Sequence, residues 1–153
     1  MEMKNIIKLF TVFVLLLGCG FEPILQSKNL NFSINEITKK GEEKLNLKFE
    51  RKIKEFINLD NSKKIYDLEI KTQINKFASS KDTKGNPKTF NLEINSELIV
   101  IKNKEIISVK NFAKNTSYKT KSSKFELKNY EQNLINNLFE KIIDEIIVHI
   151  NSL

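Results

Sequence analysis

The sequence is poor in the residue types that most often cross-link a fold or hold a metal. Its 153 residues include one cysteine, Cys19, and one histidine, His149. A single cysteine excludes an internal disulfide, and one Cys with one His leaves no set of ligands for structural zinc. Because His149 lies near the end of a helical pattern, we expect it to be an exposed partner of that helix end rather than a metal ligand.

Glycine is also scarce, and the familiar catalytic motifs are missing. Four glycines leave little material for loops that cradle phosphate, and the chain has no G-x-S-x-G, P-loop, G-x-G-x-x-G or H-E-x-x-H pattern. The carboxylates of Glu93 and Glu97 share the wet side of a predicted strand, but alternation alone places them there. We therefore expect no enzyme, no catalytic residue, no metal and no cofactor.

The charge balance is positive, but it is carried almost wholly by lysine. The chain has 26 Lys and Arg residues against 19 Asp and Glu, a formal net charge of +7, and Arg51 is the one arginine. Positive charge favours polyanions such as nucleic acid, anionic lipid or a phosphorylated glycolipid. A surface poor in arginine, however, lacks the two-pronged donors that usually bind phosphate specifically.

The first eighteen residues have the pattern of an export signal. A segment with Lys4 and Lys8 precedes the apolar run 9–17, which is too short to cross a hydrocarbon core of ~30 Å as a helix. The run ends in Leu-Leu-Gly-Cys, which resembles the bacterial lipobox. That resemblance implies that residues 1–18 are a lipoprotein signal peptide, that the Cys19 thiol accepts a diacylglyceryl group, and that the new amino terminus is acylated, typically with palmitate.

Two alternatives for this segment stay open. Cys19 could be a buried residue in a leader that is cut elsewhere, or part of a short anchor helix. If the lipobox interpretation holds, the residue after the cysteine, Gly20, differs from the Asp that retains lipoproteins at the inner membrane, which indicates the outer membrane. Residues 19–29, with one proline and little periodicity, then form a lipidated tether, and residues 30–153 form a single domain.

Hydrophobic periodicity predicts six elements in the order β-α-β-β-β-α. Apolar residues alternate with polar ones in three segments, recur at helical spacing in two, and alternate again after a tight reversal at 102–104. In the last strand Ile107, Val109 and Ala113 share a face. The predicted strands begin near residues 30, 65, 90 and 105, and the predicted helices cover 41–59 and 130–150.

This order predicts an α+β fold. The first helix can cross between two parallel strands, the next three strands can form a meander, and both helices then pack on one face of a four-stranded mixed sheet. The other face carries residues such as Glu69, Lys71 and Glu93, and we expect it to meet water or a polar partner.

Lysines gather around the loop between the second and third strands and before the last helix. One interpretation is that they are solvated and discourage pairing at strand edges. The other is that they form a surface for an anion; nucleic acid is then disfavoured, because an exported protein meets little of it, and lipopolysaccharide is favoured. The candidate lipopolysaccharide contacts are Lys76, Lys81, Lys84, Lys88, Lys119, Lys121 and Lys124. The group of lysines before the last helix also includes Lys110, Lys114 and Lys128.

Several segments together resemble the lipopolysaccharide-assembly lipoprotein family LptE. They are the lipobox that closes in GCGFEP, the order of elements, the strand TFNLEINSELIVI, the segment NTSY and the final helix YEQNLINNLFEKIIDEI. The resemblance covers essentially the whole chain. It implies a protein that is lipid-anchored to the outer membrane, faces the periplasm and inserts as a plug into the lumen of the β-barrel LptD. It further implies that such a protein supports barrel assembly, helps to deliver lipopolysaccharide to the cell surface, and is not an enzyme.

Cys19 is the one residue that carries over from the family as functional. The basic residues that contact lipopolysaccharide in the family have no clear match here, because Asn136 and Asn137 stand where a lysine is expected in the last helix. The alternative function is a periplasmic lipoprotein that carries an amphiphile or scaffolds another envelope complex. A carrier would need a cavity, whereas the apolar faces of the predicted helices and strands are matched to fill one another.

Overall fold

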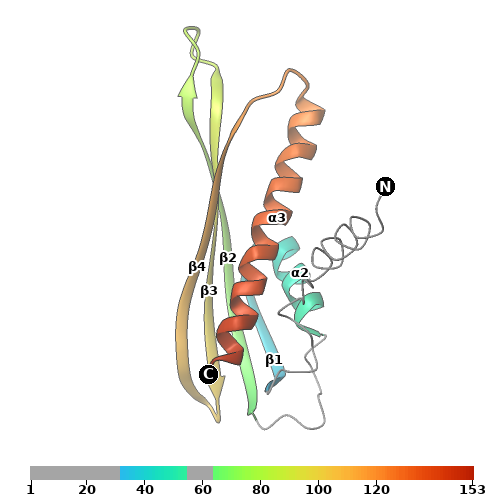
Figure 1. The fold of residues 1–153 in the computed structure, drawn as a ribbon, viewed down its shortest axis with the longest axis vertical. Helices are drawn as coiled ribbons and strands as arrows, with labels where there is room; N and C mark the ends of the chain where they lie inside the picture. The colour runs from blue at the N-terminus through green and yellow to red at the C-terminus, as the bar shows by residue number, and fades with distance from the viewer. Residues whose placement is uncertain (1–31, 55–63) are drawn as a thin grey trace, which may run out of the picture.

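The structure, a computed structural model, describes residues 32–54 and 64–153, so that the predicted signal peptide, Cys19 and the tether lie outside the described residues. The elements appear in the predicted order β-α-β-β-β-α, and the predicted α+β fold is confirmed (Figure 1). Their bounds are β1 Phe32–Gly41, α2 Glu43–Ile53, β2 Lys64–Lys81, β3 Pro87–Lys102, β4 Glu105–Lys119 and α3 Lys124–Asn151.

The four strands form one sheet in the order β1-β2-β3-β4. β1 pairs with β2 in parallel, and the pairs β2–β3 and β3–β4 are antiparallel. The parallel pair is possible because α2 carries the chain back to the start of the sheet. The mixed sheet predicted from the sequence is therefore present.

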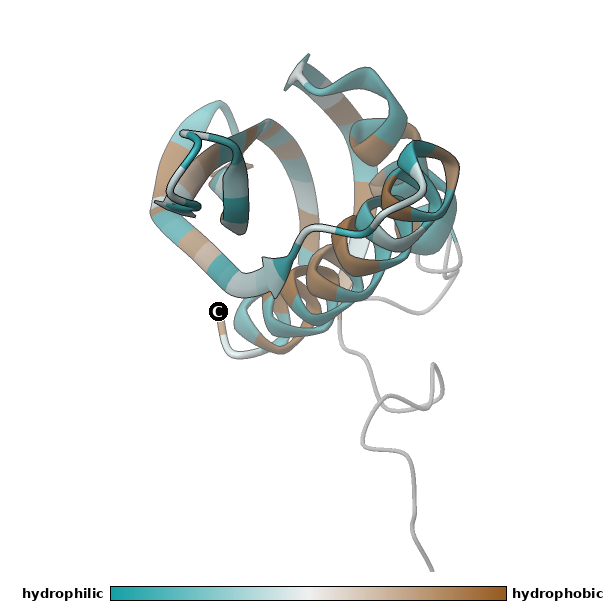
Figure 2. Cartoon of the chain, turned by 90° about the horizontal axis from the view of Figure 1, so that it is seen from above, coloured by the Kyte–Doolittle hydropathy of each residue, from teal (hydrophilic) through white to brown (hydrophobic). Residues whose placement is uncertain are grey.

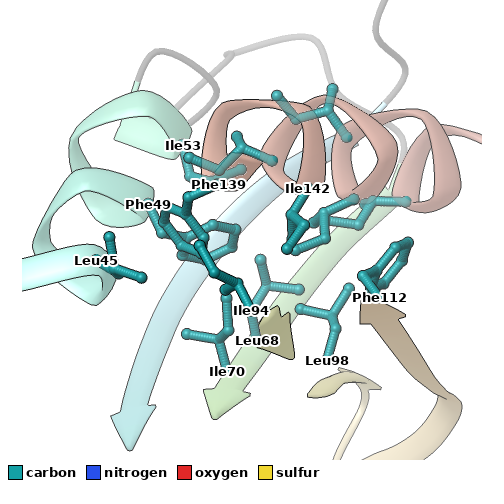
Figure 3. Packing of buried hydrophobic residues seen from close by; sticks show 14 of the residues in the cluster. Leu45, Phe49, Ile53, Leu68, Ile70, Ile94, Leu98, Phe112, Phe139 and Ile142 are labelled. Atoms are coloured by element: carbon teal, nitrogen blue, oxygen red, sulfur yellow. The ribbon is translucent and has the colours of Figure 1, made fainter. Parts of the chain in front are cut away.

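Both helices cover the same face of the sheet, and the hydrophobic core lies between them and the strands (Figure 3). The apolar residues of α2 recur at spacings of four, and those of α3 recur along its whole C-terminal half (Figure 2). The buried side chains of the core include Leu45, Phe49 and Ile53 from α2, Phe139, Ile142 and Ile146 from α3, and Leu68, Ile70, Ile94 and Leu98 from the strands.

A β-bulge in β1 explains how this strand keeps its apolar side chains on the core. The register shifts between Ile34 and Glu36, so that Ile34 pairs with Tyr66 and Ile37 pairs with Leu68. Both partners are buried. Without the extra residue, the odd spacing of Ile34 and Ile37 would place one of them on the outer face.

The corner between β1 and α2 requires glycine. Gly41 has a φ of +87°, and a Cβ at this position would lie 2.1 Å from the carbonyl oxygen of Thr72 on β2. The next residue donates its amide to the same oxygen, with 2.9 Å between Glu42 N and Thr72 O. The chain thus turns against β2 with no room for a side chain.

The reversal predicted at 102–104 is present between β3 and β4, and it is built without glycine. Asn103 and Lys104 have φ values of 52° and 68°, as the mirror-image turns that join two-residue hairpins require. Asn tolerates this conformation well, whereas Lys does so less readily.

β4 buries a different face from the one that carries most of its aliphatic residues. Phe112 and Tyr118 are 5% exposed and face the helices, whereas Val109 and Ala113 lie on the outer face of the sheet. A register shift beside Ile101, which pairs with Ile106, leaves Ile107 as the extra residue. The apolar face indicated by the sequence is therefore exposed to solvent.

His149 is not the exposed helix-end partner that we expected. It is half-buried between α3 and β4, where its Nε2 lies 2.9 Å from Ser108 Oγ and its ring meets the edge of Phe112 at 5.9 Å. Burial lowers the pKa of His149, and the nearby charge of Lys110 lowers it further. The residue thus joins the helix to the sheet.

Both helices differ in extent from their predicted ranges. Ser123 caps α3, accepting the amide of Glu126 at 3.3 Å, so that this helix begins six residues before the predicted start at residue 130. α2 begins at Glu43, two residues after the predicted start, and the residues from 55 onward lie outside the described part of the chain.

Candidate functional site: the lysine-bearing hairpin

The C-terminal end of β2 and the N-terminal end of β3 form a hairpin that projects beyond the rest of the sheet (Figure 1). Pairing with β1 stops where Gly41 meets Thr72, and pairing with β4 stops where Thr89 meets Lys119. Beyond these points the described residues show strand pairing of β2 and β3 with each other alone, and every residue from Asn75 to Lys88 is exposed. This projecting hairpin carries four of the seven candidate lysines.

The tip of the hairpin is held by one carboxylate. The Oδ1 atom of Asp82 accepts the backbone amides of Lys84 and Asn86, each at 2.8 Å, and Oδ2 accepts the Asn86 side-chain amide at 3.1 Å. These hydrogen bonds, chiefly the one from the Asn86 side chain, lower the pKa of Asp82. The tip is therefore ordered locally, by an Asp-centred turn.

Lys76 differs from the other candidates because it lies on the inner face of β2. Its Nζ lies 2.6 Å from Glu131 Oε1 on α3 and 4.6 Å from the centre of the Phe90 ring. The side chain of Glu131 is only 18% exposed. Lys76 therefore joins the base of the hairpin to the first turns of α3.

Two tyrosines complete this cluster. Tyr118 donates its hydroxyl to the same Glu131 oxygen at 2.7 Å and stacks on Phe90 with ring centres 5.6 Å apart. Burial raises the pKa of Tyr118, and the hydrogen bond to Glu131 raises it further. Tyr130 meets the edge of Tyr118 at 6.0 Å, and Lys121 Nζ lies 4.5 Å from the centre of the Tyr130 ring.

The structure thus divides the seven candidate lysines into two sets. Lys76 and Lys121 are held by Glu131 and Tyr130. Within the described residues the other five side chains have no ion pair, hydrogen bond or ring contact, and their ammonium groups face solvent: Lys81, Lys84, Lys88, Lys119 and Lys124.

The sequence did not point to Glu131 or Tyr130 as part of this site. The one available signal was that Tyr118 and Tyr130 stand at either end of the lysine-rich segment before α3. Their approach depends on the angle at which the chain enters α3. Periodicity within single elements carries no information about that angle.

The outer face of the sheet is polar in its middle and apolar at one end. Glu69, Lys71 and Glu93 lie in the middle, as expected, and Glu69 forms an ion pair with Lys40. Near the β3–β4 turn, however, Ile65 and Ile106 are 59% and 63% exposed. The polar character expected of this face therefore ends before the β3–β4 turn, where the outer face is apolar.

A cleft of about 700 Å³ lies between α2 and α3. Its walls are mostly charged or polar: Lys48, Arg51, Lys52, Asn136, Glu140, Ile143 and Asp144. Lys48 Nζ bridges the helices, at 2.9 Å from Glu140 Oε1 and 3.3 Å from the Asn136 carbonyl oxygen. The hydrogen bond from Lys48 lowers the pKa of Glu140, and this salt bridge crosses the cleft from α2 to α3.

Two further features concern the described residues as a whole. In 32–54 and 64–153 no His, Cys, Asp and Glu side chains gather in a group of three that could hold a metal ion. Over the same residues, no helix combines the length and the apolar character needed to cross a membrane.

Neither the known family profiles nor the curated protein sequences match this chain. Solved structures do. Rare lipoprotein B from Shewanella oneidensis has a TM-score of 0.57 at 16% identity, covering 77% of this chain and 95% of its own. The chain has the fold of a lipoprotein.

Two other structures agree. Lipoprotein B from Nitrosomonas europaea gives a TM-score of 0.65 at 14% identity and covers 87% of this chain and 91% of its own. A minor lipoprotein from Acinetobacter baumannii gives a TM-score of 0.57 at 8% identity and covers 80% of this chain and 93% of its own. At such identities the likeness concerns the fold, and individual side chains do not transfer.

Proposed function

We propose that the chain is an outer-membrane lipoprotein that plugs an LptD-like β-barrel, supports its assembly and takes part in lipopolysaccharide transport to the cell surface. The observation that supports this proposal is that two independent features occur together in one chain. The lipobox-like segment at Cys19 indicates a lipid anchor, and the domain behind it has the fold of solved lipoproteins. The resemblance of its segments to LptE supplies the barrel partner.

The surface of the domain suits a plug. The lumen of a large outer-membrane barrel is polar, so a body inserted in it should present a hydrated surface. The middle of the outer sheet face, around Glu69, Lys71 and Glu93, meets this requirement, and so does the projecting hairpin. We propose that these two regions lie inside the barrel.

We further propose that lipopolysaccharide meets the lysines that have no partner within the described part of the protein. Lys81, Lys84 and Lys88 occupy the projecting hairpin, and Lys119 and Lys124 lie near its base. Ammonium groups without an internal partner can contact phosphates with no ion pair to break. Lys76 and Lys121 would instead position the hairpin.

The alternative of an amphiphile carrier gains no support from the described residues. A carrier needs an apolar cavity for acyl chains. The cleft between α2 and α3 has one apolar wall residue, Ile143, and the Lys48–Glu140 salt bridge crosses it. The faces of the helices and the sheet fill one another instead (Figure 3).

Co-purification tests the barrel partner. A tagged copy, extracted from its own membranes in mild detergent, should bring down a barrel protein of LptD size. The matched control is Cys19→Ser, which should leave the domain folded but unprocessed and should recover much less barrel. Recovery of the wild-type protein without any barrel would overturn the plug proposal.

A second experiment tests the hairpin lysines. The triple variant Lys81→Gln, Lys84→Gln, Lys88→Gln should weaken lipopolysaccharide binding by about ten-fold, since exposed contacts contribute some tenths of a kcal/mol each. Its control removes the same charge elsewhere, at the exposed Lys44, Lys104 and Lys141. Equal weakening by both variants would show that only net charge matters.

A further inference from the structure

The end of the sheet at the β3–β4 turn carries an apolar patch on its outer face, which we call the turn-end patch. Ile65, Ile106 and Val109 are 59%, 63% and 57% exposed, and the half-buried Ile99 and Ile101 lie between them. Clusters of exposed aliphatic side chains are unusual on a surface that meets only water. The patch therefore needs an explanation.

Strand pairing shows that these side chains adjoin one another. Ile101 pairs with Ile106, and Ile99 pairs with Val109. Directly opposite residues of a sheet share a face, and their side chains are in contact. Ile65 lies on the same outer face, because the adjacent Tyr66 points into the core.

The patch lies at the end of the sheet where the tether joins the domain. The first residue of β1, Phe32, pairs with Lys64, next to Ile65. β1 thus begins at the same end of the sheet as the β3–β4 turn (Figure 1). Thirteen residues, 19–31, lead from the proposed lipid anchor to this point. Even fully extended, they span at most about 45 Å, so an anchored protein holds this end near its membrane.

The charges around the turn-end patch are of both signs. Lys64, Lys102 and Lys104 stand at its border, and so do Asp67 and Glu105. Asp67 accepts the side-chain amide of Asn35 at 2.8 Å. A border with charges of both signs suits zwitterionic headgroups, whose phosphate groups can meet the lysines and whose ammonium groups can meet the carboxylates.

We propose that the turn-end patch rests on the phospholipid leaflet that holds the anchor. This inference relies on the proposed function for the lipid at Cys19. The aliphatic side chains of the patch enter the boundary between headgroups and acyl chains, as exposed apolar residues of peripheral proteins do. The anchor holds the protein on the membrane, and the patch fixes its orientation.

The orientation follows from the polarity of the two ends. A polar barrel lumen offers no favourable contact to Ile65 and Ile106, whereas it suits the lysine-bearing hairpin at the opposite end. With the patch on the headgroups of the periplasmic leaflet, beside the barrel opening, the hairpin at the opposite end of the sheet points into the lumen.

The absence of tryptophan makes a direct test simple. Ile106→Trp adds a single fluorophore to the patch, and Gln73→Trp adds one on the same outer face, in the polar middle of β2. Each processed, lipidated protein is placed in phosphatidylcholine vesicles with and without brominated phosphatidylcholine. We expect a blue shift and bromine quenching for Ile106→Trp, with neither for Gln73→Trp.

A third variant tests the apolar character of the contact. Adding Val109→Asp to Ile106→Trp should abolish the blue shift, so that the tryptophan emission maximum with vesicles equals the maximum without them. The circular dichroism spectrum should stay unchanged. Equal spectra for the two tryptophan positions would overturn the inference. So would a blue shift that grows with protein concentration in the absence of vesicles, because the occupant would then be a second copy of the chain.

The mass of the intact processed protein separates this inference from the function on which it relies. A protein without diacylglyceryl at Cys19 contradicts the proposed anchor. A lipidated protein whose Ile106→Trp signal ignores brominated lipid contradicts the membrane contact alone.

Discussion

β2 and β3 pass through two different environments along their length. Between Tyr66 and Thr72 alternate residues of β2 are completely buried under the helices, whereas every residue from Asn75 to Lys88 is exposed. The same pair of strands is thus held by the core over one part, and over the other by backbone pairing, the Asp82 turn and the ion pair of Lys76 with Glu131 at the base. We therefore expect the projecting hairpin to tolerate changes that the covered part does not.

The largest effect should come from emptying the core. Phe139 on α3 is completely buried, and Phe139→Ala should lower the free energy of unfolding by about 3–5 kcal/mol. Phe77, on the hairpin, is 53% exposed, and Phe77→Ala should change it by no more than about 0.5 kcal/mol. Urea unfolding measures both. Similar losses would show that the hairpin is packed against other parts of the protein.

A pair of glycines sharpens the comparison at the backbone. Both have φ near +85°, but a Cβ on Gly41 would meet the Thr72 carbonyl oxygen, whereas one on Gly85 meets nothing within 4 Å. Gly41→Ala should therefore cost about 3 kcal/mol or more, and Gly85→Ala about 1 kcal/mol. Thermal unfolding of the two variants checks the difference. If Gly85→Ala proved the more harmful, the hairpin tip would be part of the stable body.

The Asp82 turn should matter only locally. Asp82→Ala removes the acceptor of three hydrogen bonds, so amide exchange at Lys84 and Asn86 should become faster. The global melting temperature should stay the same, because the tip makes no contact with the core. Hydrogen exchange followed by NMR resolves the two outcomes, and a lowered melting temperature would contradict the separation.

The smallest effect concerns pH. The folded state lowers the pKa of His149, so the unfolded state binds the proton more readily. The contribution of His149 is therefore fully present above the unfolded pKa of about 6.5 and is lost as the pH falls through the folded pKa. His149→Gln can keep the hydrogen bond to Ser108. In this variant the melting temperature should fall less between pH 7 and pH 5 than it does in the wild-type protein. If the melting temperature of the variant varied with pH as strongly as that of the wild-type protein, other groups would be responsible for the pH dependence.

The order of the elements and the mixed sheet could be predicted from the sequence, because each depends on patterns within a short segment. Alternation in β2 and β3, the stripe of α3 and the reversal at Asn103 are all local. The parallel pairing of β1 and β2 followed from the helix between them. In these features the buried face of each element fixes the spacing of its apolar residues, so the sequence pattern reveals them directly.

The rest depends on register and on distant contacts. A single extra residue at Ile107 changed which face of β4 is buried, and the apolar spacing of the strand did not reveal it. The contacts of Lys76 with Glu131 and of Ser108 with His149 join residues 55 and 41 positions apart. Their geometry is set by how α3 crosses the sheet, so the division of the lysines into held and unpaired sets could not be predicted.

The parallel pairing of β1 with β2 also has a consequence for the order in which the protein folds. β2, β3 and β4 follow one another as a meander, so their contacts close short loops and can form early. β1 is the first described strand to be synthesised, yet the strand with which it pairs within the described residues begins at Lys64, after α2 and the segment that follows it. The part of the domain nearest the tether is therefore made first and placed last, and until then its edge is open to wrong partners.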